Sequence, residues 1–366
     1  MGLVFLGVGS AGTAASAGPP APAVTGAPAD TGAQLSSREA ATLAYWTPAR
    51  LMSATPVSVI AAGTAAPLAT PHAPTGTPGE VPGTAPLSAT AATGGTSAQT
   101  EAAPYDSFQV TRADTKKYPY NVNGALFFTN DGHNYSCSAT SVGSFDANTA
   151  ENEIWTAGHC AVNTESLTGV HDSSALFIPA YDGQYCCSTA SVAAEKAWAP
   201  YGRFTWTGGW YTATAWLDHR DLSEDEAAME VGTSDITGLT LGQSVGTDGF
   251  AWNQAVDQQF VTFGYPAGSP YTGKFMEADI STTAGQDSSG GANSQNPLYI
   301  GSPFTGGSSG GAWNIDWSDS GPGYVDGHND YVHVNSAGQE SPADQMYSPY
   351  QDSLSNLVRC FGASSC

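Results

Sequence analysis

The chain has 366 residues, and its 10 Lys and Arg against 33 Asp and Glu give a formal net charge of −23. This length suits one large domain with extensions, or two domains. The acidic excess argues against binding to nucleic-acid backbones and against docking on anionic lipid, because both need basic surface.

The first residues are typical of an export signal. An apolar run, Leu3 to Val8, precedes small residues that end in the A-x-A sequence Ala15 to Ala17. No Lys or Arg precedes the run, so an Ala/Gly-rich disordered end is the alternative. The 6 cysteines all follow residue 130, and an even count fits disulfides in an exported protein. We predict a signal peptide at residues 1–17, an extracellular location and no membrane association.

Residues 18–104 are rich in Ala, Pro, Thr and Gly and contain few charges. Such a segment buries too little apolar surface to offset chain entropy, so we predict a largely disordered pro-segment or linker. One island, Ser36 to Pro56, differs from the rest. It is either a chance apolar patch or a pro-segment element that docks on the domain behind it. Its large apolar residues are Leu43, Tyr45, Trp46, Leu51 and Met52.

From about residue 105 onward, short β-prone runs alternate with Gly/Asn/Asp/Ser turns. The sequence "GALFFTNDGHNYSCSATSVG" predicts a strand, a turn at Asn130-Asp131-Gly132 and a second strand. "QQFVTFGYPAG", "PLYIGSPF" and "DYVHVNSAG" predict further strands, and "PYQDSLSNLVRCFG" predicts a short C-terminal helix. Many short strands over about 260 residues indicate an all-β sandwich or barrel.

A nucleophilic serine is suggested by "TGGSSGGAW", in which Ser309 is the serine of a G-x-S-G-G sequence. Glycines let the backbone turn neighbouring N–H groups toward one point and leave room for a substrate carbonyl. In a chain with 43 glycines, a flexible Gly/Ser loop is the simpler interpretation if this motif is taken alone.

A candidate base for that serine is His159 in "EIWTAGHCAVN". A serine hydroxyl is a poor nucleophile until a base takes its proton. His159 directly precedes Cys160, and Cys137 lies upstream in a neighbouring predicted strand. We predict a Cys137–Cys160 disulfide that pins the histidine loop against this strand.

The base needs a carboxylate to fix its tautomer. In "LSEDEAAMEVG", Asp225 precedes a possible strand. Asp221, Glu224 and Glu226 are competitors nearby, and a solvated acidic turn is the alternative. The residues alone leave this choice open.

TAGHC, an Asp-x-Ala-x-hydrophobic segment and G-x-S-G-G, in this order, resemble the chymotrypsin-fold serine peptidases. The similarity is greatest to secreted actinobacterial members and to the glutamyl-endopeptidase-like branch. It covers residues 105–366, and "YWTPARLMSATP" resembles a pro-region element of the secreted members. The pairing of TAGHC with a downstream G-x-S-G-G is highly specific, whereas either motif alone is weaker.

The resemblance implies two six-stranded antiparallel β-barrels, a short C-terminal helix and a disordered N-terminal extension. It makes His159 the general base, Asp225 the orienting carboxylate and Ser309 the nucleophile. The backbone N–H groups of Gly307 and Ser309 would form the oxyanion hole. Ser336 would lie at the start of the strand that pairs with an extended substrate.

Two residues depart from familiar members of this family. Ser308 stands before the nucleophile, where many animal relatives have an aspartate that pairs with a new N-terminal amine. Activation should therefore not depend on that ion pair. Pro303 stands where trypsin-like members place an acid that binds Lys or Arg, so the sequence does not favour trypsin-like specificity.

We therefore expect a secreted, monomeric serine endopeptidase that acts on protein or peptide substrates and needs no cofactor or metal. Zinc is disfavoured because the cysteines lack C-x-x-C spacing. The alternative is a non-catalytic binding protein on the same fold. The sequence leaves three pairings open for the other cysteines, which are Cys186, Cys187, Cys360 and Cys366.

Overall fold

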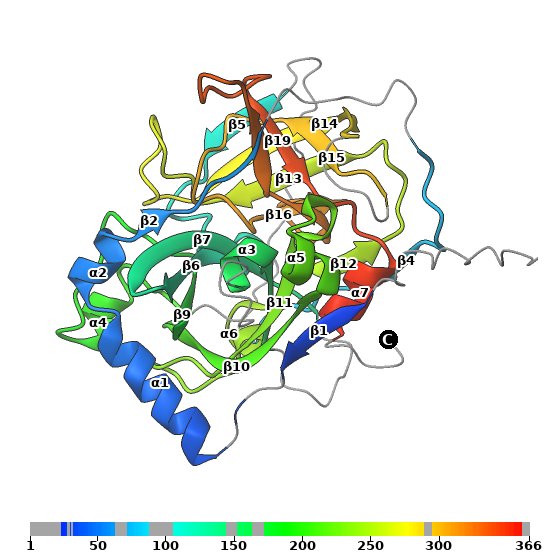
Figure 1. The fold of residues 1–366 in the computed structure, drawn as a ribbon. Helices are drawn as coiled ribbons and strands as arrows, with labels where there is room; N and C mark the ends of the chain where they lie inside the picture. Colours follow the sequence, from blue (N-terminus) through cyan, green and yellow to red (C-terminus); the bar gives the residue numbers. More distant parts are fainter. Residues whose placement is uncertain are drawn as a thin grey trace, which may run out of the picture.

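The computed structural model describes residues 23–27, 30, 32–62, 72–87, 105–143, 152–162, 172–288 and 295–360. The predicted signal peptide, residues 1–17, lies outside them. The fold is mostly β, with two sheets and few helices, which confirms the predicted fold class (Figure 1). In the described part of the chain, no helix has the length and apolar character needed to cross a membrane.

The first sheet closes into a six-stranded antiparallel barrel. Its strands pair in the order β9, β6, β7, β8, β11 and β10, and β10 returns to pair with β9. Apolar side chains that point into this barrel form its core. The six strands are β6 (Asn123–Asn130), β7 (His133–Ser141), β8 (Glu153–Ala157), β9 (Asp172–Pro179), β10 (Phe204–Ala213) and β11 (Glu226–Val231).

The turn between β6 and β7 has the predicted hairpin form. Asn130 pairs with His133, so Asp131 and Gly132 form a two-residue loop. Their φ angles are 49° and 76°. This left-handed backbone is what such a tight hairpin requires, and Asp-Gly accommodates it at low steric cost.

The second half of the domain supplies most of an 11-stranded sheet. Its core is built around Phe260, Trp313 and their apolar neighbours. Its strands from this half are β12 (Gly249–Trp252), β13 (Gln259–Gly264), β14 (Glu277–Gln286), β15 (Leu298–Gly301), β16 (Ala312–Ile315), β17 (Tyr324–His328), β18 (Tyr331–Val334) and β19 (Gln345–Ser348). The other three strands lie nearer the N-terminus: β3 (Val59–Ala62), β4 (Gly79–Val81) and β5 (Tyr105–Gln109).

Short helices connect the strands, and one follows the last described strand. The predicted C-terminal helix is α7 (Ser353–Arg359), which begins with a capping box in which the Asp352 carboxylate accepts from the backbone of Leu354 and Ser355. The others are α3 (Gly158–Ala161), α4 (Val192–Glu195), α5 (Thr214–His219) and α6 (Leu241–Val245), with 3-10 helices η1 (Tyr120–Val122) and η2 (Leu222–Glu224).

The N-terminal segment holds more regular structure than its composition predicts. Besides β3 and β4 it forms β1 (Val24–Ala27), α1 (Ala33–Tyr45), α2 (Pro48–Met52) and β2 (Thr55–Pro56). The physical reason is tertiary contact. Trp46 and Leu51 are almost fully buried and belong to the same apolar cluster as Phe127 of β6. The island around Trp46 therefore docks on the domain, although Met52 stays exposed.

The segment then crosses between the two sheets. β2 pairs in parallel with β7 of the barrel, and β3 pairs in parallel with β18 of the second sheet. Figure 1 shows this path, with β2 beside the barrel and the chain rising toward β19. Residues 55–62 thus span the boundary of the two halves.

Candidate active site

His159 sits on α3, a single turn that follows β8 directly. The side chain is buried, and the ring of Trp216 from α5 lies edge-on to it with 6.4 Å between ring centroids. Gly158 makes this packing possible: a Cβ there would lie 2.7 Å from Trp216 and 2.8 Å from a carboxylate oxygen of Asp225. The glycine of "TAGHC" thus gives the histidine room between two close neighbours.

Asp225 holds His159 through two hydrogen bonds. The backbone N–H of His159 donates to Oδ1 at 2.7 Å, and Nδ1 of the ring lies 2.9 Å from Oδ2. The Asp225 side chain is fully buried. Among the acidic residues that the sequence left open, this is the one whose carboxylate meets the histidine.

The competing acids have other surroundings. Asp221 is the N-cap of η2, and its carboxylate accepts hydrogen bonds from the N–H and the hydroxyl of Ser223. Glu226 begins β11 and pairs through its backbone with Ala157. Burial, followed by the charge of Glu224, raises the pKa of Glu226 well above its ordinary value.

The predicted Cys137–Cys160 disulfide is present and joins α3 to β7. It also brings the serine motif close. The carbonyl of Ser309 accepts a hydrogen bond from the N–H of Ser138 at 2.8 Å, and Sγ of Cys160 lies 3.8 Å from the same carbonyl oxygen. The histidine turn and the serine loop are therefore fixed to the same stretch of β7. Of the remaining cysteines, Cys186 and Cys187 are bonded to each other.

The glycines of the G-x-S-G-G motif each meet a steric demand. Gly307 and Gly310 have φ angles of 95° and 81°, in the region that disfavours other residues. A Cβ on Gly310 would lie 2.0 Å from the hydroxyl oxygen of Thr156, and one on Gly311 would lie 2.0 Å from the carbonyl oxygen of Phe263. The loop can take this shape only with glycine at these positions.

A small pocket lies beside Ser309. Ser308, Asp330 and Val332 line it from the domain, and Ser58 and Val59 line it from the N-terminal segment. The backbone N–H of Gly307 donates to the carbonyl of Val57 at 2.7 Å. Both the pocket and the Gly307 donor are thus in contact with the segment that contains β2 and β3.

The substrate-strand residue chosen from the sequence lies elsewhere. Ser336 is exposed, in a turn beyond the end of β18, and is not part of the His159 cluster. The residues of "DYVHVNSAG" that form the strand next to the pocket are Tyr331 to Val334.

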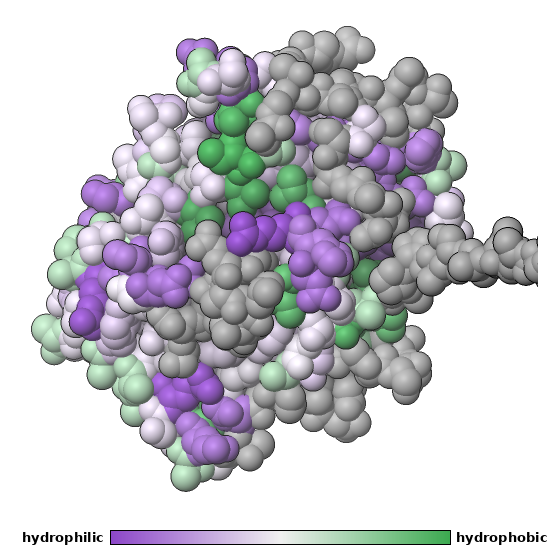
Figure 2. All heavy atoms as spheres, in the orientation of Figure 1, coloured by the Kyte–Doolittle hydropathy of each residue, from purple (hydrophilic) through white to green (hydrophobic). Residues whose placement is uncertain are grey.

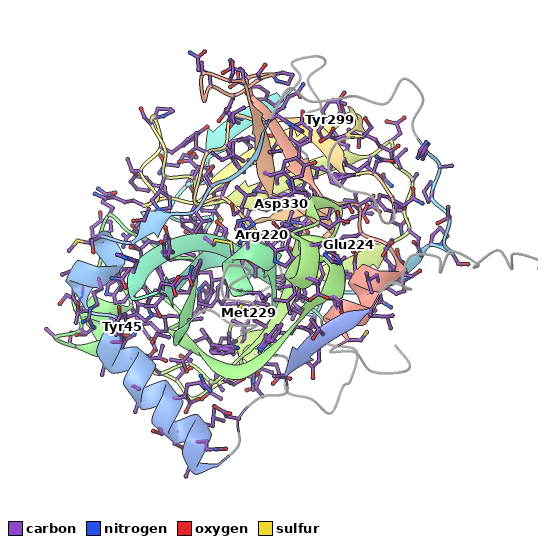
Figure 3. All side chains as sticks on the ribbon, in the orientation of Figure 1. Tyr45, Arg220, Glu224, Met229, Tyr299 and Asp330 are labelled. Atoms are coloured by element: carbon purple, nitrogen blue, oxygen red, sulfur yellow. A yellow bond between two sulfur atoms is a disulfide. The ribbon has the colours of Figure 1, made fainter. Side chains whose placement is uncertain are left out.

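Two buried residues beside His159 were not predicted from the sequence. Nε2 of His328 lies 2.9 Å from the carbonyl oxygen of Asp225, and Oδ1 of Asp330 lies 3.3 Å from Nδ1 of His159. Figure 3 labels Asp330 at the boundary of the two sheets, near α3. The only sequence signal was an acid and a histidine just before the predicted strand "YVHV".

Opposing effects set the protonation of these groups. Burial lowers the pKa of His159, but the charge and hydrogen bond of Asp225, followed by those of an ionised Asp330, outweigh it and raise the pKa to about 10. Burial lowers the pKa of His328 to about 4, so this ring is neutral and its Nε2–H donates to Asp225. The ligand atoms of His159, Asp225 and Asp330 lie within 4.8 Å of one another, a spacing that a metal ion also accepts.

The fold and this site were compared with known proteins. The protease Anisep from Arthrobacter nicotinovorans is 29% identical over 67% of this chain and 96% of its own, with a TM-score of 0.53. A thermostable serine protease, AL20, from an extremophilic microorganism is 25% identical over 67% of this chain and 98% of its own, also with a TM-score of 0.53. No family model and no curated protein matches the chain.

These similarities confirm the resemblance predicted from the sequence. The chain has a trypsin-like fold, and the solved structures that it resembles are serine proteases. The fold and the neighbours therefore support a protease of the trypsin-like fold.

Proposed function

We propose that this chain is a secreted serine endopeptidase that cleaves peptide bonds with Ser309, His159 and Asp225. The observation that carries the proposal is the pair of hydrogen bonds from His159 to the buried Asp225, next to a G-x-S-G-G loop fixed to the same strand. A carboxylate on Nδ1 leaves Nε2 as the nitrogen that exchanges a proton with the nucleophile. The disulfide and the even cysteine count support an extracellular location.

The reaction would follow from these roles. The Ser309 oxygen attacks the carbonyl carbon of the substrate while His159 takes the hydroxyl proton. The backbone N–H groups of Gly307 and Ser309 donate to the oxyanion. His159 then gives the proton to the leaving amine as the C–N bond breaks. Water, activated by His159, finally hydrolyses the acyl-enzyme and restores the serine.

Labelling with a fluorophosphonate tests this assignment. Such a probe phosphonylates an activated serine, and mass spectrometry then identifies the modified residue. We expect one adduct, on Ser309, and none in Ser309→Ala or His159→Ala. Ser308→Ala is the matched control and should still be labelled. Absence of labelling in the mature protein, after removal of residues 18–104, would instead favour the alternative of a non-catalytic binding protein on this fold.

We further infer that residues 18–104 are a pro-segment and that residues 55–62 cover the site before its removal. The support is the contact of Val57 with the Gly307 N–H and of Ser58 and Val59 with the pocket beside Ser309. Figure 2 shows apolar residues along the path that the chain takes from β2 toward β19 in Figure 1. Ile60 of β3 is 57% exposed and faces away from this contact.

The chain direction of this segment argues that it blocks the site without being cut there. A cleavable peptide with its carbonyl at Gly307 must place its leaving amine next to His159, which the disulfide ties to β7. In the segment, the residues before Val57 pair with β7 and those after it pair with β18. The amide of Ser58, as leaving group, would therefore lie toward β18 and not toward β7, where His159 is held. We expect maturation to occur elsewhere, between residues 85 and 120.

Two measurements test the pro-segment. N-terminal sequencing of the secreted active form should find a start between residues 85 and 120, and a start at residue 18 with full activity would contradict the proposal. In the full chain, Val57→Pro removes the N–H that donates to Ser136 and should speed fluorophosphonate labelling. Ile60→Asp, at an exposed position of the same segment, should not. Equal labelling rates in native, Val57→Pro and Ile60→Asp chains would show that residues 55–62 do not mask the site.

A further inference from the structure

His159 faces two carboxyl groups. Oδ2 of Asp225 lies 2.9 Å and Oδ1 of Asp330 lies 3.3 Å from the same ring nitrogen, Nδ1. Both side chains are buried: Asp225 has no exposed surface, and Asp330 is 2% exposed. They come from different halves of the domain, since Asp225 precedes β11 of the barrel and Asp330 precedes β18 of the second sheet.

Two buried carboxyls this close to one nitrogen atom are not both ionised at neutral pH, because like charges repel strongly where water is excluded. Burial, followed by the charge of Asp225, raises the pKa of Asp330 well above its ordinary value. Asp225, in contrast, already accepts two hydrogen bonds from His159, one from its backbone N–H and one on its ring nitrogen Nδ1. The proton of the pair therefore belongs on Asp330.

The other groups around Asp330 leave this assignment in place. His328 on β17 is neutral, because burial lowers its pKa. Tyr331 follows Asp330 in the chain, and burial raises the pKa of its hydroxyl, so it too is uncharged. Glu340, beyond β18, lines the same pocket and could only add negative charge, which again favours a protonated Asp330.

A neutral Asp330 matters for the base. With both carboxyls ionised, His159 would hold its own proton through the neutral range and could not accept one from Ser309. We propose that Asp330 is a positioning residue, which keeps its proton, donates it to Asp225 and so holds Asp225 on Nδ1 of His159 without adding a second charge. This inference rests on the proposed serine peptidase function and names a further residue for that reaction.

Two substitutions distinguish the effect of the hydrogen-bond donor at residue 330 from the effect of its charge. Asp330→Asn keeps an N–H donor at this position but cannot ionise, so its kcat should stay within about threefold of native near neutral pH. Asp330→Ala removes the donor to a charged acceptor, which should lower kcat about tenfold or more with KM nearly unchanged. Asp326→Asn, at a buried acid on β17, is the matched control and should leave both constants unchanged. All variants are compared after the same activation of the full chain.

The dependence of kcat/KM on pH distinguishes the proposed role of Asp330 from a merely structural one, which would not change this dependence. In the native enzyme, ionisation of Asp330 at alkaline pH should remove the donor to Asp225 and place two like charges beside His159, which should lower kcat/KM. Asp330→Asn should lack this alkaline decline, whereas Asp326→Asn should keep it. A native-like decline in Asp330→Asn, or a loss in Asp330→Asn equal to that in Asp330→Ala, would overturn the proposal.

A second measurement needs no activity, so its failure is distinct from failure of the proposed function. The proton on Nδ1 of His159 should give a low-field NMR signal in the full chain. This signal should shift at alkaline pH in the native chain and in Ser309→Ala, and should stay constant over that range in Asp330→Asn. The same alkaline shift in Asp330→Asn would contradict a protonated Asp330.

Discussion

Loss of the Cys137–Cys160 bridge should weaken both the domain and its active site. The bridge joins β7 to the turn that carries His159, and both sulfurs are buried. We consider the double variant Cys137→Ala/Cys160→Ala, because a single change would leave a reactive thiol in the core. Ser309→Ala serves as the background for the stability measurements, so that self-cleavage does not obscure unfolding.

The size of the stability effect follows from the loop that the bridge closes. The two cysteines are 23 residues apart. Closing a loop of this length restricts the unfolded chain by about 3 kcal/mol at 25 °C. Since a domain is stable by only about 5–15 kcal/mol, this is a large share. At roughly 2–4 °C per kcal/mol for a domain of this size, the melting temperature should fall by about 6–12 °C.

Urea unfolding followed by tryptophan fluorescence measures the first effect. The midpoint should fall, because the unfolded state gains freedom while the native contacts largely persist. A loss below about 1 kcal/mol would contradict the loop-closure argument. The second effect is measured with Ser309 intact and well below the unfolding midpoint. There, kcat should fall because α3 is a single turn that the bridge holds, and an unchanged kcat would show that Asp225 and Trp216 position His159 without the bridge.

Three further predictions concern single side chains. Asp225→Asn should lower kcat on the order of 10⁴-fold by analogy with a well-studied triad, whereas Asp221→Asn keeps the side-chain oxygen that caps η2 and should leave kcat and stability nearly unchanged; the reverse result in steady-state kinetics would exchange their roles. Gly310→Ala should destabilise by about 3 kcal/mol or more and abolish labelling, because of its φ and its contact with Thr156, whereas Gly321→Ala, which meets no atom within 4 Å, should do neither in thermal unfolding and labelling assays. Burial raises the pKa of Asp279 to about 7, so the folded state keeps a proton that the unfolded chain has lost; stability should therefore fall by roughly 4 kcal/mol between about pH 4 and pH 7, and Asp279→Asn should flatten this part of the curve of unfolding free energy against pH.

The sequence predicts those parts of the site that depend on local backbone chemistry. The glycines around Ser309 and the glycine before His159 are needed because atoms of other segments lie 2.0–2.8 Å from the position that a Cβ would take, and this demand leaves a short, recognisable pattern. The Cys137–Cys160 bridge was predictable because Cys137 lies in a strand of the predicted hairpin and Cys160 directly follows His159. Fold class followed from the alternation of short strands and turns, which is also a local property.

Residues that act through distant contacts left no such pattern. Asp330 gains its place only when β18 of the second sheet meets the barrel. His328 likewise reaches the Asp225 carbonyl across more than one hundred residues of chain. The sequence left the docking of the N-terminal island open for the same reason, since Trp46 and Leu51 find apolar partners only on the finished domain. The composition of a segment indicates only how much apolar surface the segment can bury by itself. Here the domain provides the apolar surface against which the segment packs.

The acidic composition and the site chemistry have one physical consequence in common. A chain with a net charge of −23 gains by keeping some carboxyls neutral, because each buried proton removes a repelling charge. Burial raises the pKa of Glu153, Asp248 and Asp326 well above their ordinary values, and it does the same for Asp330 beside the base. For each of these acids the folded state binds a proton more tightly than the unfolded state, so each contributes stability that declines as the pH rises. The proton that would let Asp330 support Asp225 is therefore lost in the same direction of pH as the protons that keep the scaffold neutral, so activity and stability should both decline as the pH rises.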